Sequence, residues 1–406
     1  CIFIVLKAQR HKYLMRSSFC LKKFGLCLIL PASPLLSLCL FGNLVITKFN
    51  NMNFKLNLLV GFRLGRKLIG LLLVCTSTFL AQAQGITSPN KNLSLQFELT
   101  ANGVPSYQLS YKGKSVIKPS TLGIEAKDTP SFMDGFSITN SAQTMVDDSW
   151  NPVLGEEKTI RNNYNELVVT LAQAKNNNRY IRIRFRLFND GLGFRYEFPK
   201  QTDLNYFVIK EEHTEFQLAA DHKIFWIPGD YDTNEYAYTT SKISEIPSLI
   251  KKATIHLNAQ SPIKDLAVQT PSMMKTADGL YINIHEAALI NYPAMSLNVD
   301  AKTFKMSSHL TPDAVGNKGY MQTDTQTPWR TIVVSDKATE ILASKMILNL
   351  NEPTKYKDVS WIKPMKFIGV WWEYFVAGKS TWAYGKENNV KLGQDFSKLT
   401  PNGKHG

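Results

Sequence analysis

Hydrophobic and polar residues alternate along most of the chain between Ser94 and about Val333, and this period of two predicts half-buried β-strands. Clear examples are residues 93–99 (LSLQFEL), 107–111 (YQLSY), 167–171 (LVVTL) and 181–187 (IRIRFRL). In the last segment Arg182, Arg184 and Arg186 fall on one face of the predicted strand, and the apolar side chains fall on the other. Many short strands with few helices are typical of a large antiparallel β-sandwich.

The pattern changes after this region, which indicates a domain boundary near residue 355. Ser335 is positioned to cap a short helix over residues 336–344. A polar, proline-containing link follows, and then the apolar run 366–372 (KFIGVWW). A continuous apolar run is typical of a strand that is buried on both faces, as in a parallel sheet or barrel. We therefore predict a β-sandwich domain over residues 84–355 and the start of a second domain at 356–406.

The basic charge of the chain is concentrated near its N-terminus. Residues 1–85 contain eleven lysines and arginines and no acidic residue, so they carry +11 of the net charge of +14, which leaves +3 for residues 86–406. A nucleic-acid-binding domain needs a basic surface on its folded part. We therefore predict no nucleic-acid partner.

The same N-terminal region has the features of an export signal. Basic residues follow Met52, residues 68–80 are apolar, and Ala81-Gln82-Ala83 is a small-x-small cleavage site. About 13 apolar residues are fewer than a membrane-spanning helix needs. We interpret residues 52–83 as a cleaved signal peptide, and we predict export to the periplasm without a stable membrane anchor. Cys75 is compatible with a lipoprotein signal, but Val74 before it is larger than such signals require.

Residues 1–51 precede this methionine and show no clear period. We interpret them as non-native upstream translation, although residues 26–45 are apolar enough for a second membrane segment. All five cysteines lie before residue 86. The remaining chain therefore lacks disulfides, thiolate nucleophiles and cysteine-bound zinc, which is compatible with export.

An acidic segment, DYDTNE, begins at Asp230 and starts like the calcium loop of an EF-hand. An EF-hand would need glycine where Glu235 stands and a bidentate glutamate where Ser241 stands. The segment is therefore not an EF-hand. Taken alone, it predicts a solvated turn.

Residues 225–246 (FWIPGDYDTNEYAYTTSKISEI) and 368–374 (IGVWWEY) resemble the N-terminal portion of glycoside hydrolase family 97. That family contains calcium-dependent α-glucosidases of bacterial starch-utilisation systems. Further segments that match in the same order are residues 155–158, 161–167, 185–198, 281–289 and 348–353. The resemblance implies a galactose-mutarotase-like super-sandwich, followed by the first strand of a truncated (β/α)8 barrel.

The resemblance also implies site residues. Glu235 corresponds to a calcium ligand that the sandwich sends to the mouth of the barrel, so calcium is the implied cofactor of the full-length protein. Trp371, at the end of the presumed first barrel strand, is the implied substrate-facing residue. The loop of His256, Leu257 and Asn258 occupies a position near the substrate, although its residues differ from those of the family.

The function implied by the resemblance is that of an exported α-glucosidase that acts on malto-oligosaccharides with calcium and inversion. The catalytic carboxylates are expected beyond Gly406, in the protein's own missing barrel domain, so the chain alone is expected to be inactive. Two alternatives remain open. One is a retaining α-galactosidase of the same family, and the other is a carbohydrate-binding module from a truncated gene.

Overall fold

The computed structural model describes residues 20–29, 37–45, 84–257 and 259–366. The chain separates into two compact units, Cys1–Leu80 and Ala81–Gly406, and each is described by itself. In the first unit, β1 (Cys20–Ile29) and β2 (Ser37–Val45) form an antiparallel pair. Among the described residues, no helix has the length and apolar character needed to span a membrane.

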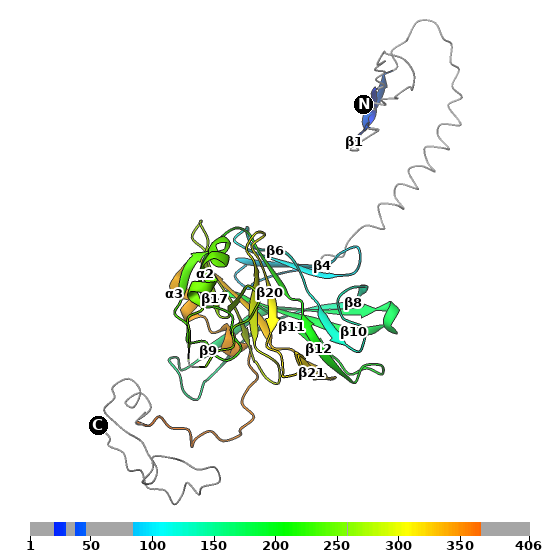
Figure 1. The fold of residues 1–406 in the computed structure, drawn as a ribbon. Coiled ribbons are helices and arrows are strands. Elements are labelled where there is room, and N and C mark those ends of the chain that lie inside the picture. The colour runs from blue at the N-terminus through cyan, green and yellow to red at the C-terminus, as the bar shows by residue number, and fades with distance from the viewer. Residues whose placement is uncertain (1–19, 30–36, 46–83, 258, 367–406) are drawn as a thin grey trace, which may run out of the picture. The chain divides into compact units, whose positions relative to one another are not determined.

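Three antiparallel sheets make up the described part of the second unit (Figure 1). The largest has ten strands, which are, in spatial order, β15 (Thr239–Lys242), β14 (Lys223–Trp226), β17 (Ser272–Lys275), β18 (Tyr281–Ala287), β23 (Trp329–Ser335), β11 (Gly191–Phe198), β10 (Arg179–Phe188), β9 (Ile160–Gln173) and β8 (Phe136–Trp150), with β22 (Thr325–Gln326) paired to β11. The second sheet has eight strands, β16 (Ala267–Gln269), β19 (Met295–Asp300), β20 (Lys305–Leu310), β13 (Glu215–Leu218), β6 (Lys114–Thr121), β5 (Pro105–Tyr111), β4 (Leu93–Leu99) and β3 (Gln84–Thr87). The third consists of β21 (Gly319–Gln322), β12 (Tyr206–Glu212) and β7 (Ile124–Lys127).

The few helices in the described part of the second unit are short. They are the α-helices α2 (Ile246–Ala253), α3 (Ala338–Ala343) and α4 (Met346–Asn349) and the 3₁₀ turns η1 (Ala174–Asn176) and η2 (Ile243–Glu245). The predicted cap at Ser335 was wrong. Ser335 still pairs with Tyr281 as the last residue of β23, so its backbone is extended and α3 begins only at Ala338.

The hydrophobic core lies between the two larger sheets. Phe97 on β4 packs against Phe185 on β10 with ring centroids 5.6 Å apart, and Tyr107 on β5 packs against Phe194 on β11 at 5.0 Å. Each such aromatic pair adds about 0.5–1.5 kcal/mol beyond the burial of its area. The predicted large antiparallel sandwich is therefore confirmed, and β10 buries its apolar face as the alternation predicted.

On the arginine face of β10, Arg182 is exposed, but the other two arginines are covered by ion pairs and aromatic rings. Arg184 pairs with Glu166 and Glu197, and Arg186 pairs with Glu166 at 2.8 Å. The guanidinium groups of Arg186 and Arg195 lie over the ring of Trp329, 4.9 and 4.3 Å from its centroid. Trp329 also belongs to a second apolar cluster, whose other buried members are Tyr164, Phe188, Ala287, Val333, Met346 and Leu350. This cluster fixes α4 and the adjoining chain to the ten-stranded sheet.

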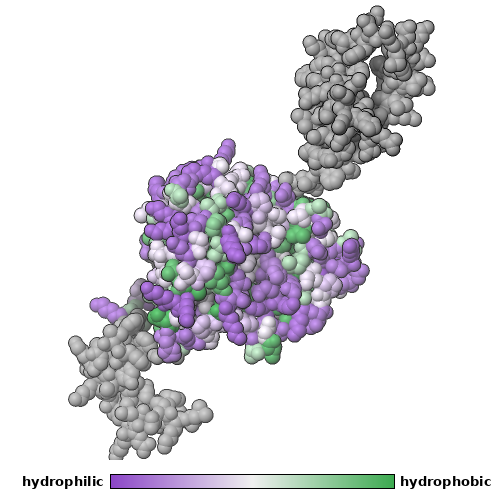
Figure 2. Space-filling view, turned by 45° about the horizontal axis from the view of Figure 1, so that its top comes forward, coloured by the Kyte–Doolittle hydropathy of each residue, from purple (hydrophilic) through white to green (hydrophobic). Residues whose placement is uncertain are grey.

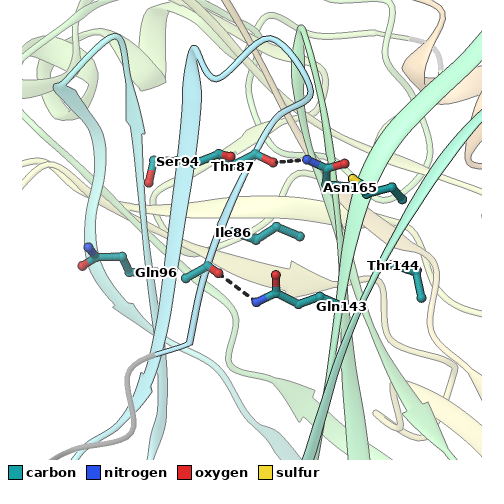
Figure 3. A pocket seen from close by; sticks show the side chains of 9 residues that line it. Ile86, Thr87, Ser94, Gln96, Gln143, Thr144 and Asn165 are labelled. Atoms are coloured by element: carbon teal, nitrogen blue, oxygen red, sulfur yellow. Dashed lines mark hydrogen bonds between the residues drawn. The ribbon is translucent and has the colours of Figure 1, made fainter.

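A hollow of about 580 Å³ lies where the edge strand β3 meets the hairpin of β8 and β9 (Figure 3). The amide of Gln143 donates to the carbonyl of Gly85 at 3.0 Å, and the amide of Asn165 donates to the carbonyl of Thr87 at 2.7 Å. These bonds hold β3 against the hairpin. The lining contains no charged side chain, and we assign it no chemistry.

The described surface in Figure 2 is mainly hydrophilic, and hydrophobic residues are scattered over it in small groups. Individual exposed apolar residues are normal on a soluble surface. Some of the larger exposed ones, such as Leu289 and Ile290, lie in a loop that follows β18.

Candidate functional site

One end of the ten-stranded sheet gathers the loops that contain most of the predicted site residues. β14 pairs antiparallel with β17, and β17 pairs antiparallel with β18. The loop 227–238 that follows β14 and the loop 288–294 that follows β18 therefore leave the sheet at the same end. The loop 254–266 is bonded to the first of them, because Tyr231 donates its N–H to the carbonyl of Ser261 at 3.0 Å.

Asp230 determines the shape of the 227–238 loop. Its buried carboxylate accepts N–H bonds from Asp232 at 2.8 Å, from Thr233 at 3.0 Å and from Ser261 at 3.1 Å. The hydroxyl of Tyr236 donates to the same carboxylate at 2.9 Å. Burial alone would raise the pKa of Asp230, but these donors lower it below its usual value. Burial and the bond to Asp230 raise the pKa of Tyr236 to about 12.

Two further side chains fix the backbone of this loop. The amide of Gln269 donates to the carbonyls of Pro228 and Thr233, at 2.9 and 2.8 Å. The hydroxyl of Tyr231 and the Nε2 of His309 are 2.7 Å apart, and the two rings are stacked. The loop is therefore fixed by both of the larger sheets. It follows β14 of the ten-stranded sheet, and Gln269 and His309 belong to the eight-stranded sheet.

Glu235 lies at the exposed part of this loop. Its N–H donates to the hydroxyl of Thr233 at 3.2 Å, and within residues 84–257 and 259–366 its carboxylate forms no hydrogen bond or ion pair. The carboxylate of Asp232 is also exposed, but it accepts a hydrogen bond from the hydroxyl of Ser261. The loop thus presents the carboxylate of Glu235 to solvent on a fixed backbone.

The oxygen atoms of this loop can be compared with the ligands that a calcium ion requires. Ca²⁺ takes six to eight oxygen ligands. The oxygens of Asp230 are already used by four donors, which leaves the carboxylate of Glu235 as the loop group that is best placed to bind a cation. No group of three or more acidic, histidine or cysteine side chains in the described residues is arranged to hold a metal ion. Within the described residues, Glu235 therefore offers a single free carboxylate to a cation.

The other predicted site residues are placed only in part. His256 is exposed and Leu257 is partly buried, and the N–H of Leu257 donates to the side chain of Gln260. Both lie in the 254–266 loop that is bonded to the Glu235 loop through Ser261. Asn258 and Trp371 lie outside the described residues, as does most of the apolar run predicted to begin a barrel.

A buried ion network was missed by the sequence analysis. Arg330 on β23 donates two bonds to Glu212 on β12, at 2.8 and 2.7 Å, and one to Glu286 on β18 at 2.6 Å. The side chains of Arg330 and Glu212 are fully buried. Burial would raise the pKa of Glu212, but Arg330, Thr214 and Tyr292 lower it; burial raises the pKa of Glu286 despite Arg330.

This network holds the third loop of the site. The hydroxyl of Tyr292 donates to Glu212 at 2.9 Å, and the N–H of Met295 donates to Glu286 at 3.2 Å. Leu289 and Ile290, at the tip of the same loop, are 44% and 60% exposed. The network therefore fixes the base of a loop that presents two apolar side chains at the same end of the sheet as the Glu235 loop.

Replacing Asp230 by alanine should lower the free energy of unfolding at neutral pH by about 1–3 kcal/mol, because the buried hydroxyl of Tyr236 and three part-buried N–H groups lose their acceptor. Since the pKa of Asp230 is lowered on folding, its contribution is full above the unfolded value of about 3.9 and is lost as the pH falls through the folded value. Urea unfolding over a pH series measures both effects. Asp232→Ala, a substitution in an exposed neighbour, is the matched control, and equal losses in the two variants would contradict this role.

The comparisons with known proteins agree with this architecture. A family model described as Glycosyl-hydrolase 97 N-terminal matches residues 86–353. The chain belongs to glycoside hydrolase family 97. It is 24% identical over 339 residues to a retaining α-galactosidase of Bacteroides thetaiotaomicron, a match that covers 76% of this chain and 47% of that protein.

Solved structures of the family are also similar. A family 97 enzyme from a Pseudoalteromonas strain, in complex with acarbose, is 37% identical with a TM-score of 0.63; the match covers 71% of this chain and 41% of that one. A variant of that enzyme in complex with panose gives the same identity, TM-score and coverage. The chain therefore spans less than half the length of these family 97 relatives, and the part it shares with them includes the sandwich.

Proposed function

We propose that this chain is the N-terminal part of an exported family 97 α-glucosidase that hydrolyses malto-oligosaccharides. The observation that carries the proposal is the rigid loop on which Asp230 fixes the backbone and Glu235 faces outward. In this proposal Glu235 supplies one oxygen ligand to a calcium ion, and the other ligands and the catalytic carboxylates come from the barrel. Calcium, when bound, would supply positive charge near the glycosidic bond.

The preference for glucosides is supported by the relative of higher identity. The Pseudoalteromonas enzyme, at 37% identity, was solved with acarbose and panose, and panose is built from α-linked glucose units. The second candidate is a retaining α-galactosidase, which the relative from Bacteroides thetaiotaomicron favours at 24% identity. The higher identity leads us to place the α-glucosidase first.

Substrate assays on the full-length protein separate the two candidates. The proposal predicts turnover of p-nitrophenyl α-glucoside and maltotriose, loss of turnover with a calcium chelator, and little turnover of p-nitrophenyl α-galactoside or melibiose. Proton NMR of the first product distinguishes inversion, which releases the β-anomer, from retention. Turnover of the galactosides with a retained anomer would replace the α-glucosidase by the α-galactosidase.

Purified residues 84–406, without further chain, should hydrolyse neither class of substrate. Glycoside hydrolysis requires two carboxyl groups across the scissile bond, and the proposal places both in the barrel. The assay compares this polypeptide with the full-length protein at equal concentration and millimolar calcium. Release of p-nitrophenol clearly above the buffer rate would show that the catalytic pair lies within this chain.

A further inference from the structure

Two tyrosines stand on the outer face of the three-stranded sheet. Tyr206 on β12 is 59% exposed and Tyr320 on β21 is 51% exposed. Tyr206 is paired with Gln322, and Val208 is paired with Tyr320. Because paired residues and residues two apart share a face, both rings lie on the same side in diagonally adjacent positions. Their neighbours Phe207 and Met321 point to the core.

The ring of Tyr320 is held in place by its hydroxyl group. That hydroxyl donates to the carboxylate of Asp313 and accepts a bond of 2.8 Å from the amide of Asn317. Asp313 in turn accepts the N–H groups of Val315 and Asn317, at 2.9 and 2.8 Å. The hydroxyl group of Tyr320 is therefore already hydrogen-bonded within the protein, while about half of the residue remains exposed. A ring fixed before binding loses little conformational freedom when a ligand stacks on it.

One cation and one anion lie close to the two rings, so this face has little net charge. Lys127, across the sheet from Val208, donates to the neutral amide of Asn317 at 3.2 Å, and the carboxylate of Asp313 accepts from the hydroxyl of Tyr320. Lys210 on β12 pairs with Glu125 on β7 at 2.7 Å. Val208 and Gln322, which lie in the same two rows as the rings, are uncharged. Such a face suits a neutral ligand with both apolar and hydroxyl groups, and it offers little to an acidic or basic polymer.

We propose that Tyr206 and Tyr320 form a surface binding site for a neutral α-glucan chain, outside the Glu235 loop. Sugar rings carry patches of C–H groups that stack on aromatic faces, while their hydroxyls bond to polar neighbours such as Gln322. The choice of glucan rests on the proposed function. The site would hold part of a long substrate near the enzyme without taking part in the reaction.

Native electrophoresis of the full-length protein in gels with soluble starch tests this site, with maltoheptaose titration as the quantitative measurement. We expect Tyr206→Ala and Tyr320→Ala each to weaken binding about threefold and the double variant about tenfold, in line with the energy of an aromatic contact. Tyr320→Phe keeps the ring and should retain most of the binding. Tyr356→Ala removes another exposed tyrosine, 71% exposed, and is the matched control.

Turnover of p-nitrophenyl α-glucoside, which is too short to reach both sites, should be unchanged in the double variant. Starch binding equal to wild type in the double variant would overturn the proposal. A joint loss of short-substrate turnover and thermal stability would also overturn it, since the tyrosines would then be domain contacts. If the wild type hydrolyses α-galactosides but its starch binding still depends on the tyrosines, the surface site stands and the proposed α-glucosidase falls.

Discussion

Replacing Arg330 by methionine should lower the free energy of unfolding by about 3–5 kcal/mol, which is the usual cost of removing one partner from a buried ion pair. The substitution keeps an unbranched apolar stem but leaves Glu212 and Glu286 without their shared cation. Both carboxylates are in the core, where an unpaired charge is poorly solvated. Urea unfolding of the variant and the wild type measures the difference.

The control for this substitution is Arg182→Met, which removes an exposed arginine from β10 and should change the free energy of unfolding by less than about 0.5 kcal/mol. The deficit of Arg330→Met should also depend on pH. Without Arg330, burial raises the pKa of both carboxylates above their unfolded values, so the variant recovers stability as the pH falls through the raised folded pKa values and the carboxylates become protonated. A small deficit that does not change with pH would mean that the network contributes little to the fold.

The Arg330→Met substitution should also affect the 288–294 loop of the candidate site. Because Tyr292 and Met295 are bonded to the same two carboxylates, loss of Arg330 should loosen the loop that contains Leu289 and Ile290. Limited proteolysis should then cut this loop faster than in Arg182→Met. The buried network would thereby connect the stability of the sandwich to a loop at the Glu235 end of the sheet.

The sheet could be predicted from the sequence because its signal is local. On β10 the alternation of isoleucine, phenylalanine and leucine with arginine gives the buried face directly, and residues 93–99 coincide with β4. The start of α3 was misplaced because β23 continues to Ser335 through its pairing with β18. That pairing is a tertiary contact, and the local capping pattern contains no information about it.

The site could be predicted only in part. The acidic segment at Asp230 was recognisable as a turn, but its sequence does not show that Asp230 is the buried acceptor and Glu235 the exposed carboxylate. That distinction depends on Ser261 and Gln269, which come from separate strands and loops. The network of Glu212, Glu286 and Arg330 joins three strands that are distant in sequence, and no short motif marks it.

In the full-length protein Glu235→Gln should weaken calcium binding by at least about tenfold, since a neutral amide replaces one of the few charged ligands of a hard cation. Activity on α-glucosides should fall with it and return in part at high calcium. The melting temperature without calcium should stay within about 2 °C of the wild type, because the side chain is exposed and makes no contact that the fold requires.

Asp232→Asn is the matched control for this experiment. Asp232 belongs to the same loop and is also exposed, but its carboxylate is bonded to Ser261 and it has no proposed role at the metal. It should leave calcium affinity and activity close to those of the wild type. Equal losses in Asp232→Asn and Glu235→Gln would point to a general effect of negative charge in the loop.

Calcium titration of wild type, Glu235→Gln and Asp232→Asn by calorimetry on the full-length protein will show whether the sandwich supplies a calcium ligand to a catalytic barrel. We expect one tight site in the wild type and in Asp232→Asn, and clearly weaker binding at the same stoichiometry in Glu235→Gln. Equal calcium affinity in all three proteins would contradict this expectation and leave Glu235 as a solvated turn residue.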